Sequence, residues 1–461
     1  MPSSSCIVIF DVGKTNKKML VFDESYRLVH EESQRMEETT DEDGFPCEDL
    51  ATLSNWILNS FAAIRQDPRF HIKAVNFSAY GASFVYLDEA GRPIAPLYNY
   101  LKPLSPTIQD RFYRNHGGAS QLAKQTASPV LGNLNSGLQV YRIREEKPEL
   151  WKRIRYALHL PQYLSHLVSG KFFTDITSIG CHTHLWDFQS GAYHPWVASE
   201  GLLEKFAPLL PCDQLAATIN GVAVGAGLHD SSAALIPYLA GFEDPFLLLS
   251  TGTWCISLNP FNHLTLSDYE LDNDCLCYLS FQAKPVKASR LFAGHEHEEQ
   301  TKRLAAHFQK PEDYYKTVKA DPLIIGQMVQ QHPTVKIREH HHMIGPSIFS
   351  QRKLADFADY ETAYHCLIGD LIQQQVRSTH IVLHNTGVKS IFVDGGFSRN
   401  PIYMQLLAMA YPEYGVYAAT VPQASAIGAA LAVHERWNSL PRPAHLIQLV
   451  NFRAGGLHAP A

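Results

Sequence analysis

Two apolar runs near the start of the chain are separated by a short polar stretch. Residues 7–10 (Ile-Val-Ile-Phe) and 19–22 (Met-Leu-Val-Phe) are rich in β-branched and aromatic side chains, which is typical of strands. The stretch between them contains Gly13-Lys14-Thr15. The pattern therefore predicts a hairpin whose first strand ends in Asp11 and whose turn is formed by residues 13–16.

The Gly-Lys-Thr triplet raises the question of a Walker-type phosphate-binding loop. Such a loop needs another glycine five residues before the glycine of the triplet, because its backbone N–H groups curl around the phosphates. That position is Val8, in the middle of the first predicted strand. We conclude that this segment is a hairpin turn and not a Walker loop.

The second half of the chain begins with the same pattern. After Gly241 and Pro245, residues 246–259 indicate an apolar strand, a Gly/Thr turn and a second strand. Two hairpins of this kind, one opening each half, suggest an internally duplicated fold. Because 461 residues are too many for one ordinary core, we expect two domains, residues 1–242 and 243–461.

Three further elements of the second half follow from periodicity. Apolar residues between 357 and 384 share one helical face, which predicts a helix. Residues 390–394 (SIFVD) indicate a buried strand, followed by the loop GGFSRN. Residues 423–437 predict a helix whose many small side chains allow close packing against a neighbour. Residues 262–350 show no clear period.

Composition narrows the class of protein. Hydrophobic residues make up 45% of the chain and charged residues 18%, as in soluble globular proteins. A formal charge of −6 without a long basic run argues against a nucleic-acid partner. No stretch approaches the roughly 18 apolar residues of a membrane span. The first residues lack the basic and apolar regions of a secretion signal, so we expect a cytoplasmic protein with reduced thiols.

Two histidine-rich stretches are candidate metal sites. They contain His295 and His297 in one case and residues 340–342 in the other. Neither has the His-Glu-X-X-His spacing that places two ligands on one face of a helix. We therefore do not predict a metal site at either stretch.

The two predicted turns suit phosphoryl transfer, which needs neutralised phosphates, a held Mg²⁺ and a positioned acceptor. Gly13 and Gly252 let backbone N–H groups approach phosphate oxygens. Asp11, at a strand end, is a candidate anchor for Mg²⁺ through water. The alternative is that each turn only joins two strands. The other candidate phosphate ligands are the hydroxyls of Thr15, Ser250, Thr251 and Thr253 and the ammonium of Lys18, or else of Lys14 or Lys17.

Asp230 is the strongest acid/base candidate. It follows Gly-Ala-Gly-Leu-His and precedes an Ala/Leu-rich run, which places it at the N-terminus of a helix. One interpretation is a helix N-cap, which is worth about 1 kcal/mol. The other is a carboxylate kept ionised by the helix and aimed at a substrate hydroxyl. His229 beside it is interpreted as a core or supporting histidine.

Gly395 and Gly396 follow the predicted strand 390–394 and are typical of an adenosine-binding turn. Two glycines give a flat backbone platform, and Ser398 and Asn400 lie within reach of a nucleotide in such a turn. The alternative is an ordinary loop of an α/β fold, where glycine pairs are common.

The order of these motifs resembles that of the FGGY carbohydrate kinases, from residue 7 to about 437. The resemblance implies two actin-like (ribonuclease H-like) α/β domains with ATP and sugar in the cleft between them. It also implies ATP and Mg²⁺ as cofactors and a small-molecule sugar as substrate, in a monomer or homodimer. By this resemblance Asp11, Gly13, Thr15 and Lys18 match the first phosphate motif, Ser250, Thr251, Gly252 and Thr253 the second, Gly395 and Gly396 the adenosine motif, and Asp230 the catalytic base.

Within the family, the pattern is most similar to that of the L-rhamnulose and L-fuculose kinases. "STGTW" resembles their second phosphate motif, and "AYGASFVYLD" their sugar-side strand. Ser83 stands where that strand has its acid, and Asn99 and Tyr100 replace an Arg-Asp pair. The resemblance implies a ketose or deoxyketose substrate, such as rhamnulose, fuculose or xylulose. The expected sugar-side residues are Tyr80, Gly81, Ser83, Lys102 and Asp230.

Two other functions remain open from the sequence. One is a non-catalytic sugar- or nucleotide-binding regulator on the same fold, suggested by the lost sugar-side acids. The other is a different actin-like ATPase, such as a chaperone or filament protein. Retention of Asp11, Asp230 and both phosphate turns argues against the regulator. A chaperone or filament protein should not need Asp230 placed after Gly-Leu-His.

Overall fold

The computed structural model describes residues 4–331, 348–421, 423–443, 446–453 and 456–457. They form two compact units. Unit 1 comprises Met1–Gly241, Cys277–Pro285 and Gln423–Leu446, and unit 2 comprises Phe242–Leu276, Val286–Pro422 and Ile447–Ala461. The small-residue helix predicted near the C-terminus belongs to unit 1.

Unit 1 is built on one mixed sheet in the order β11-β12-β6-β1-β2-β3, with β13 also paired to β6. Strands β1 and β2 form the predicted hairpin, and β6 lies parallel to β1 on its other side. The strands are β1 (Ser4–Val12), β2 (Lys17–Asp23), β3 (Leu28–Gln34), β6 (Phe70–Ala79), β11 (Leu215–Ile219), β12 (Val222–Gly225) and β13 (Leu228–His229).

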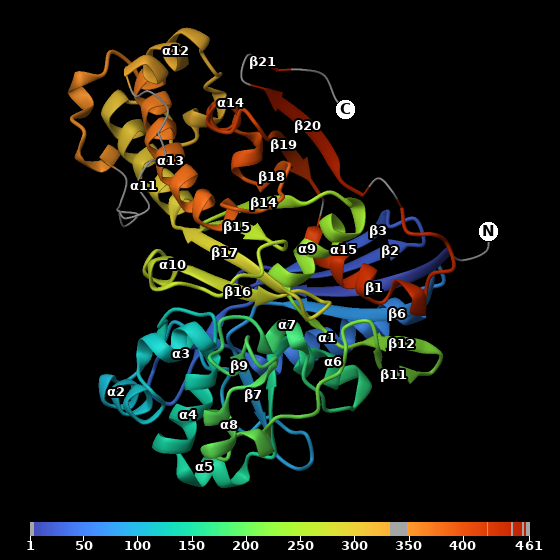
Figure 1. The fold of residues 1–461 in the computed structure, drawn as a ribbon. Helices are drawn as coiled ribbons and strands as arrows, with labels where there is room; N and C mark the ends of the chain where they lie inside the picture. The colour runs from blue at the N-terminus through green and yellow to red at the C-terminus, as the bar shows by residue number, and fades with distance from the viewer. Residues whose placement is uncertain (1–3, 332–347, 422, 444–445, 454–455, 458–461) are drawn as a thin grey trace. The chain divides into compact units, whose positions relative to one another are not determined.

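Helices cover both faces of this sheet because alternate residues of β1 point to opposite sides. Val8 and Phe10 join the core that α1 (Leu50–Gln66) and α6 (Leu160–Ser169) complete. Ile7 and Ile9 are equally buried but lie outside that cluster. On this side α15 (Ala424–Ala432) contacts β1 and β6 and packs on α9 (Asp230–Gly241), as Figure 1 shows.

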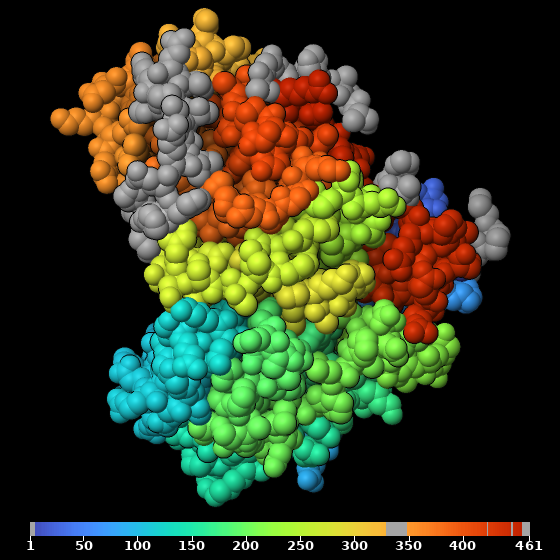
Figure 2. Space-filling view, in the orientation of Figure 1, coloured from blue at the N-terminus to red at the C-terminus, as the bar shows by residue number. Residues whose placement is uncertain are grey.

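The remaining elements of unit 1 are short. Helices α2 and α3 lie at its surface, in cyan in Figure 2. These elements are β4 (Glu38–Thr40), β5 (Pro46–Glu48), β7 (Phe84–Leu87), β8 (Tyr156–His159), β9 (Trp186–Asp187), β10 (Ala192–Tyr193), α2 (Pro106–Asn115), α3 (Ala119–Gln125), α4 (Ser136–Glu146), α5 (Pro148–Arg153), α7 (Ile176–Ile179) and α8 (Pro195–Ser199).

A second sheet, most of whose residues belong to unit 2, has the order β16-β17-β15-β14-β18-β19-β20-β21. It repeats the plan of unit 1, because β14 and β15 form the second predicted hairpin and β18 lies parallel to β14. The strands are β14 (Phe246–Thr251), β15 (Cys255–Asn259), β16 (Cys275–Leu279), β17 (Pro285–Leu291), β18 (Ser390–Gly395), β19 (Gly415–Thr420), β20 (Gln448–Arg453) and β21 (Gly456–Leu457).

The predicted helix between 357 and 384 is α13 (Tyr360–Leu383), whose N-terminus is capped by the Asp359 side chain. Part of the region without a clear period folds as α10 (Asp268–Asp272), α11 (Ala293–Phe308), α12 (Pro322–Gln331), β16 and β17. Helix α14 (Pro401–Ala410) follows the Gly-Gly loop. In the described residues no helix is both long and apolar enough to cross a membrane.

Helix α9 packs closely against α15 in unit 1. A Cβ atom placed on Gly428 of α15 would lie 1.8 Å from the carbonyl oxygen of Ala233 in α9, so the two backbones touch. The small-residue pattern of residues 423–437 predicted a close approach of this kind. The absence of a side chain at Gly428 therefore sets the distance between these helices.

We expect Gly428→Ala to lower the free energy of unfolding by about 1–3 kcal/mol, because the added methyl group forces the two backbones apart. Gly326→Ala in α12 is the matched control. A Cβ there meets nothing within 4 Å, so the same change should stabilise by about 0.5–1 kcal/mol. Urea denaturation followed by circular dichroism measures both. Equal effects at the two sites would contradict the packing argument.

Candidate functional site

Asp11 lies in the middle of the unit 1 sheet, close to the turn of the first hairpin. It is paired with Lys18 on the antiparallel strand β2 and with Ser78 on the parallel strand β6. The N–H of Gly13 closes the turn by donating to the carbonyl of Asn16 at 2.9 Å. Thr15 is exposed at the tip of the turn. The structure thus brings the four residues of the first predicted phosphate motif to one end of β1.

The three lysines of this hairpin have different surroundings. Lys17 is buried and pairs with Glu48 at 2.5 Å, and Lys14 pairs with Glu38 at 2.6 Å. The Lys18 ammonium lies 3.0 Å from Glu31 Oε1 and 3.2 Å from Gln423 Oε1, with its side chain 26% exposed. Burial of Lys17 leaves Lys18 and Lys14 as the cations of this turn that a ligand can reach.

The carboxylate of Asp11 is held by a residue from the other end of the chain. Ser425, in the first turn of α15, donates its hydroxyl to Asp11 Oδ2 at 2.8 Å. Burial raises the pKa of Asp11 to about 6, and the negative charge of Asp230 adds to this effect. Hydrogen bonds from Ser425 and Ser78 act in the opposite direction. The two acidic candidates therefore lie close enough to influence each other.

Asp230 is the first residue of α9. Its Oδ1 accepts from the backbone N–H of Ser231 at 2.6 Å, and Nε2 of His229 lies 3.3 Å from the same oxygen. The side chain is 35% exposed, yet protein atoms surround its other sides, and this burial raises the pKa of Asp230 to about 6. The residue is thus reachable from solvent and is protonated more readily than an ordinary aspartate.

The predicted sugar-side residues have mixed surroundings. The hydroxyl of Tyr80 donates to Glu48 at 3.0 Å, and the Lys102 ammonium pairs with both Asp41 and Asp43 at 2.5 Å. These polar groups are thus engaged within the protein. Ser83 is buried, with its carbonyl accepting from the N–H of Leu160.

Gly81 differs from the other three, because it lies against the ring of His229, the residue before the catalytic candidate Asp230. A Cβ atom there would come within 2.8 Å of the His229 ring. Among the described contacts, Gly81 is the sugar-side residue that the structure brings to the neighbour of Asp230.

Two residues that act on the acidic candidates or respond to them were not expected from the sequence. Ser425 was hidden in a run of small residues 414 positions away from Asp11. Tyr100 packs edge-to-face on Tyr80, with ring centroids 6.1 Å apart, and the charge of Asp230 helps to raise the pKa of its phenol. Tyr100 could have been noticed, because it replaces the acid of the Arg-Asp pair expected in the sugar-side motif. No feature of the sequence pointed to Ser425.

In unit 2 the second phosphate motif and the adenosine motif lie side by side. The parallel register of β14 and β18 places Ser250 opposite Asp394 and Thr251 opposite Gly395. Ser250, Gly252 and Thr253 are exposed. The N–H of Gly252 donates to the carbonyl of Trp254 and closes the turn. Two motifs whose paired residues are 144 positions apart (250 to 394 and 251 to 395) therefore meet at the carboxyl ends of neighbouring strands.

Thr251 is buried and ties these motifs together. Its hydroxyl donates to the carbonyl of Asp394 at 2.5 Å and accepts from the N–H of Phe397 at 2.9 Å. Its own carbonyl accepts from the N–H of Gly396 at 2.8 Å. Gly395 has a φ of +89°, and a Cβ there would meet the Thr251 carbonyl oxygen at 1.9 Å. The first glycine of the loop is required for this close approach.

Ser398 and Asn400 shape the same loop. The Ser398 hydroxyl donates to the carbonyl of Gly395 at 2.8 Å. Asn400 caps α14 with its side-chain oxygen and donates from Nδ2 to the Tyr364 hydroxyl at 2.8 Å. In this structure both side chains hold the loop, and Asn400 also lines a cavity beside it.

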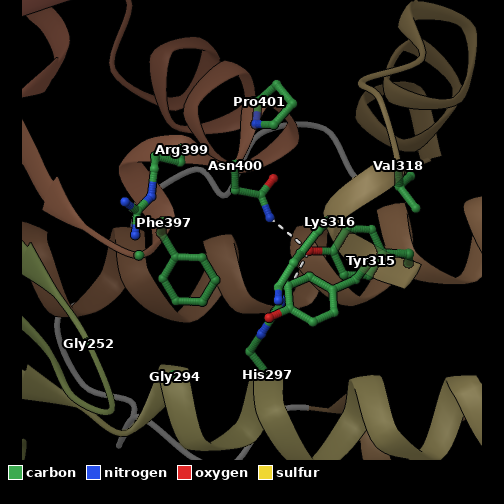
Figure 3. A pocket seen from close by; sticks show the side chains of 12 residues that line it. Gly252, Gly294, His297, Tyr315, Lys316, Val318, Phe397, Arg399, Asn400 and Pro401 are labelled. Atoms are coloured by element: carbon green, nitrogen blue, oxygen red, sulfur yellow. Dashed lines mark hydrogen bonds between the residues drawn. The ribbon is translucent and has the colours of Figure 1, made fainter. Parts of the chain in front are cut away.

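This cavity, about 530 Å³ in volume, lies next to the Gly-Gly loop in unit 2 (Figure 3). Its size is in the range of small-molecule sites. Nε2 of His297 lies 3.0 Å from the Tyr364 hydroxyl, and burial lowers the pKa of His297 to about 4. The lining residues are Gly252, Gly294, His297, Tyr315, Lys316, Val318, Tyr364, Gly396, Phe397, Arg399, Asn400 and Pro401.

The walls of the cavity are aromatic and neutral, and cations lie at its edge. The His297 ring stands edge-on to Phe397 and Tyr315, with centroids 5.2 and 5.0 Å away. Lys316 and Arg399 add positive charge, and Gly252 and Gly396 connect the cavity to both motifs. Such a site fits a flat aromatic group joined to an anionic one. His297, Tyr315 and Tyr364 were not predicted to take part.

The histidine-rich stretches do not form a metal centre in the described residues, where no group of three His, Cys, Asp or Glu side chains is placed to hold an ion. His295 stacks on Phe292, and His297 belongs to the cavity. Residues 340–342 lie outside the described residues.

Two family models match the chain over most of its length. Residues 6–236 match the N-terminal domain of the FGGY family of carbohydrate kinases, and residues 243–441 match the C-terminal domain of carbohydrate kinase FGGY. The chain belongs to the FGGY family of carbohydrate kinases.

Curated relatives of this FGGY chain are similar at modest identity. An L-fuculokinase of Escherichia coli (strain K12) is 24% identical over 201 residues, which cover 40% of this chain and 41% of the relative. A rhamnulokinase of Bacillus subtilis (strain 168) is 24% identical over 282 residues, 57% of this chain and 54% of the relative. The chain thus spans about half the length of these relatives.

Solved structures confirm the predicted fold class. A carbohydrate kinase from Novosphingobium aromaticivorans matches with a TM-score of 0.79 and 20% identity, over 98% of this chain and 94% of that one. A ligand-bound xylulose kinase from Lactobacillus acidophilus matches with a TM-score of 0.77 and 14% identity, over 97% and 94%. At these identities the likeness concerns the two-domain α/β fold.

In this FGGY chain we expect Thr251→Val to lower the free energy of unfolding by about 1–3 kcal/mol, because the buried N–H of Phe397 loses its acceptor. Ser250→Ala, at the exposed neighbouring position, should stay within about 0.5 kcal/mol of the parent. Urea denaturation of both variants measures the difference. A Thr251→Val protein as stable as Ser250→Ala would show that the threonine does not hold the loop.

Proposed function

We propose that this protein transfers the γ-phosphoryl group of ATP to a hydroxyl of a sugar, with Asp230 accepting the proton of that hydroxyl. The observation that carries the proposal is the state of the Asp230 carboxylate. Within the described residues, every hydrogen bond and ion pair of this group falls on Oδ1. Oδ2 is therefore left for an acceptor hydroxyl, on a side chain that is 35% exposed.

The pKa of Asp230 suits a general base. Burial raises it to about 6, so the group is ionised at neutral pH but holds a proton more firmly than an ordinary aspartate. A base with a pKa near the working pH combines the correct protonation state with a favourable proton transfer. An exposed aspartate with the ordinary pKa of 3.8 would be a weaker base.

The cavity of unit 2 is the proposed site of the nucleotide. Its aromatic walls suit a purine ring, and Gly252 and Gly396 at its edge lead toward the exposed hydroxyls of Ser250 and Thr253. The N–H of each turn glycine closes its own turn, whereas the N–H groups of Lys14, Thr15 and Thr253 have no backbone acceptor in the described turns. These N–H groups are the proposed backbone donors to phosphate oxygens.

Asp11 is proposed to hold Mg²⁺ through water. The residues fit such an ion, because Asp11 and Asp230 form a pair of carboxylates whose mutual repulsion helps to raise the pKa of Asp11. Mg²⁺ keeps several waters and is commonly bound by one or two carboxylates together with substrate phosphates. When bound, the ion neutralises charge on the β- and γ-phosphate oxygens.

A ketose or deoxyketose, such as rhamnulose, fuculose or xylulose, is the proposed acceptor. The names of the similar proteins support this class, since they include an L-fuculokinase, a rhamnulokinase and a xylulose kinase. Tyr80, Ser83 and Lys102 stay candidates for the sugar side. Gly81 lies against the His229 ring, beside Asp230, and the charge of Asp230 acts on the phenol of Tyr100.

A non-catalytic sugar or nucleotide binder is the second candidate. It is favoured by the engagement of Lys102 with Asp41 and Asp43, which leaves its ammonium unavailable to a sugar in this structure. Such a protein would bind ATP or a sugar without releasing ADP, and the experiment below separates the two.

We expect ADP release from Mg-ATP to depend on a sugar when ketoses, deoxyketoses, polyols and aldoses are tested. Asp230→Asn should lower kcat by about 10²–10⁴-fold, because the acceptor proton loses its base. Asp244→Asn is the matched control, since this carboxylate is 71% exposed on the surface of unit 2. ATP binding without sugar-dependent ADP release would favour the binding role. Near-normal turnover in Asp230→Asn would remove Asp230 as the base.

We expect kcat/KM to fall below a pH of about 6, because protonation of Asp230 removes the base. The same pKa also affects stability. A folded-state pKa above the ordinary value of 3.8 means that the folded protein holds this proton more tightly, so ionisation costs stability as pH rises from about 4 to 6. Asp230→Asn should therefore be more stable than the parent at pH 7 but not at pH 4. Thermal unfolding at both pH values measures this, and a destabilised variant at pH 7 would contradict it.

A further inference from the structure

We propose that Lys17 is a positioning residue whose buried ammonium fixes the first hairpin turn, so that the backbone N–H of Thr15 faces outward and donates to a phosphate oxygen. The inference rests on the proposed function, in which this turn meets the phosphates of ATP. It assigns a role to a cation that cannot reach the ligand itself, since the Lys17 side chain is 2% exposed.

The Lys17 ammonium has two partners at the base of the turn. It donates to the carbonyl oxygen of Lys14 at 3.0 Å and pairs with Glu48 Oε1 at 2.5 Å. The carboxylate supplies the opposite charge that a buried ammonium needs. The Glu48 side chain is also buried, so little water competes for this pair. The ammonium is thus a fixed donor directed at one carbonyl of the turn.

The direction of this carbonyl decides the direction of the next N–H. The described residues contain no cis peptide bond, and in a trans peptide the C=O and the following N–H point to opposite sides. Because the Lys14 carbonyl points at the buried Lys17 ammonium, the N–H of Thr15 points away from the interior. Thr15 is exposed, and its N–H has no acceptor among the described residues. This N–H is therefore an open backbone donor.

A second carbonyl of the turn is also engaged within the protein. The carbonyl of Asn16 accepts from the N–H of Gly13 at 2.9 Å. If the peptide between residues 14 and 15 were flipped, the Lys14 carbonyl oxygen would face outward, and its partial negative charge would repel a phosphate. Anchoring by Lys17 disfavours this flip. A donor that is already in place needs no reorganisation when the anion binds.

The partner of Lys17 belongs to the hairpin of β4 and β5, which holds the turn at two points. Glu38 and Glu48 are opposite each other in the antiparallel register of this hairpin, so their side chains lie on one face. Glu48 pairs with Lys17, and Glu38 pairs with the Lys14 ammonium at 2.6 Å. The hydroxyl of Tyr80 donates to the second oxygen of Glu48 at 3.0 Å. The position of the carboxylate that binds Lys17 is therefore itself restrained.

The test removes the anchor without leaving a buried charge unpaired. Lys17→Met with Glu48→Gln deletes both charges and keeps an acceptor for the Tyr80 hydroxyl. Lys287→Met with Glu270→Gln is the matched control in unit 2, where the two charged atoms are 2.6 Å apart and the lysine side chain is 1% exposed. We expect the first double variant to bind Mg-ATP about 10-fold more weakly than the parent, as on loss of one charge-assisted hydrogen bond. The control pair should keep the affinity of the parent. Isothermal titration calorimetry measures both.

A second measurement follows the Thr15 N–H directly. In full-length protein labelled with ¹⁵N-threonine, the Thr15 amide signal is identified by its loss in Thr15→Ser. We expect saturating Mg-ATP to move this amide proton downfield in the parent, because a phosphate oxygen accepts from it. The movement should be smaller in Lys17→Met/Glu48→Gln and the same as in the parent in Lys287→Met/Glu270→Gln.

Three results would overturn the proposal. One is a folded Lys17→Met/Glu48→Gln protein with the parent's affinity for Mg-ATP. Another is an equal loss of affinity in the control pair, which would reduce the effect to general destabilisation. The third is a Thr15 signal that saturating Mg-ATP leaves unmoved in the parent, a result that does not depend on the folding of any variant.

The two measurements also separate this proposal from the proposed function. If Mg-ATP moves the Thr15 signal while no sugar supports ADP release, the proposed function fails and the anchored turn stands. Sugar-dependent ADP release with an unmoved Thr15 signal would leave the proposed function in place and remove the role assigned to Lys17.

Discussion

The packing of α9 against α15 is the constraint on which the acidic centre of unit 1 depends. Asp230 begins α9, and Ser425, which binds Asp11, lies in the first turn of α15. Because Gly428 has no side chain, the helices meet backbone to backbone at Ala233. The first turns of both helices are therefore held in place. The spacing between the carboxylates of Asp11 and Asp230 is fixed as a result. Asn76 of β6, which donates to the carbonyl of Ala429, fastens α15 to the sheet beneath.

Burying two carboxylates near each other disfavours their ionised forms. The resulting rise in their pKa values suits the proposed catalysis. Burial is the largest cause of the raised pKa of both Asp11 and Asp230. Elsewhere in unit 1, buried charges are compensated, as with Lys17 and Glu48 or Lys102 and Asp41. The acidic pair is close to Lys18, but that ammonium already meets Glu31. The uncompensated charge thus lies at the residues for which a cation and a proton are proposed, and raised pKa values of this kind are typical of functional sites.

Periodicity predicted the elements of this fold better than the directions of single side chains. Both hairpins, α13, β18 and the small-residue helix lie where the pattern placed them, because each has a clear run of apolar residues. The side-chain directions of Ser250 and Thr251 could not be predicted in this way. All four preceding residues of β14 are buried, so the alternation that tells one face of a strand from the other is absent. Nothing in the sequence therefore indicated that Thr251 points inward and Ser250 outward.

Contacts between segments far apart in the sequence could not be predicted either. Ser425 reaches Asp11 across 414 positions, and Lys102 meets Asp41 across 61, so neither pair forms a local motif. A lysine in a sugar-side motif suggests a ligand contact, and in this structure the Lys102 ammonium lies between two carboxylates. These ion pairs hold the segment of residues 98–102 to the hairpin of β4 and β5. The side chain of Asn99 adds a second link by donating to the carbonyl of Pro46 in β5. Under the proposed function, the Gly81 backbone beside His229 and the phenol of Tyr100 are the neutral groups left to recognise an acceptor. These groups suit an uncharged ligand better than an anionic one, because Asp11 and Asp230 already supply negative charge.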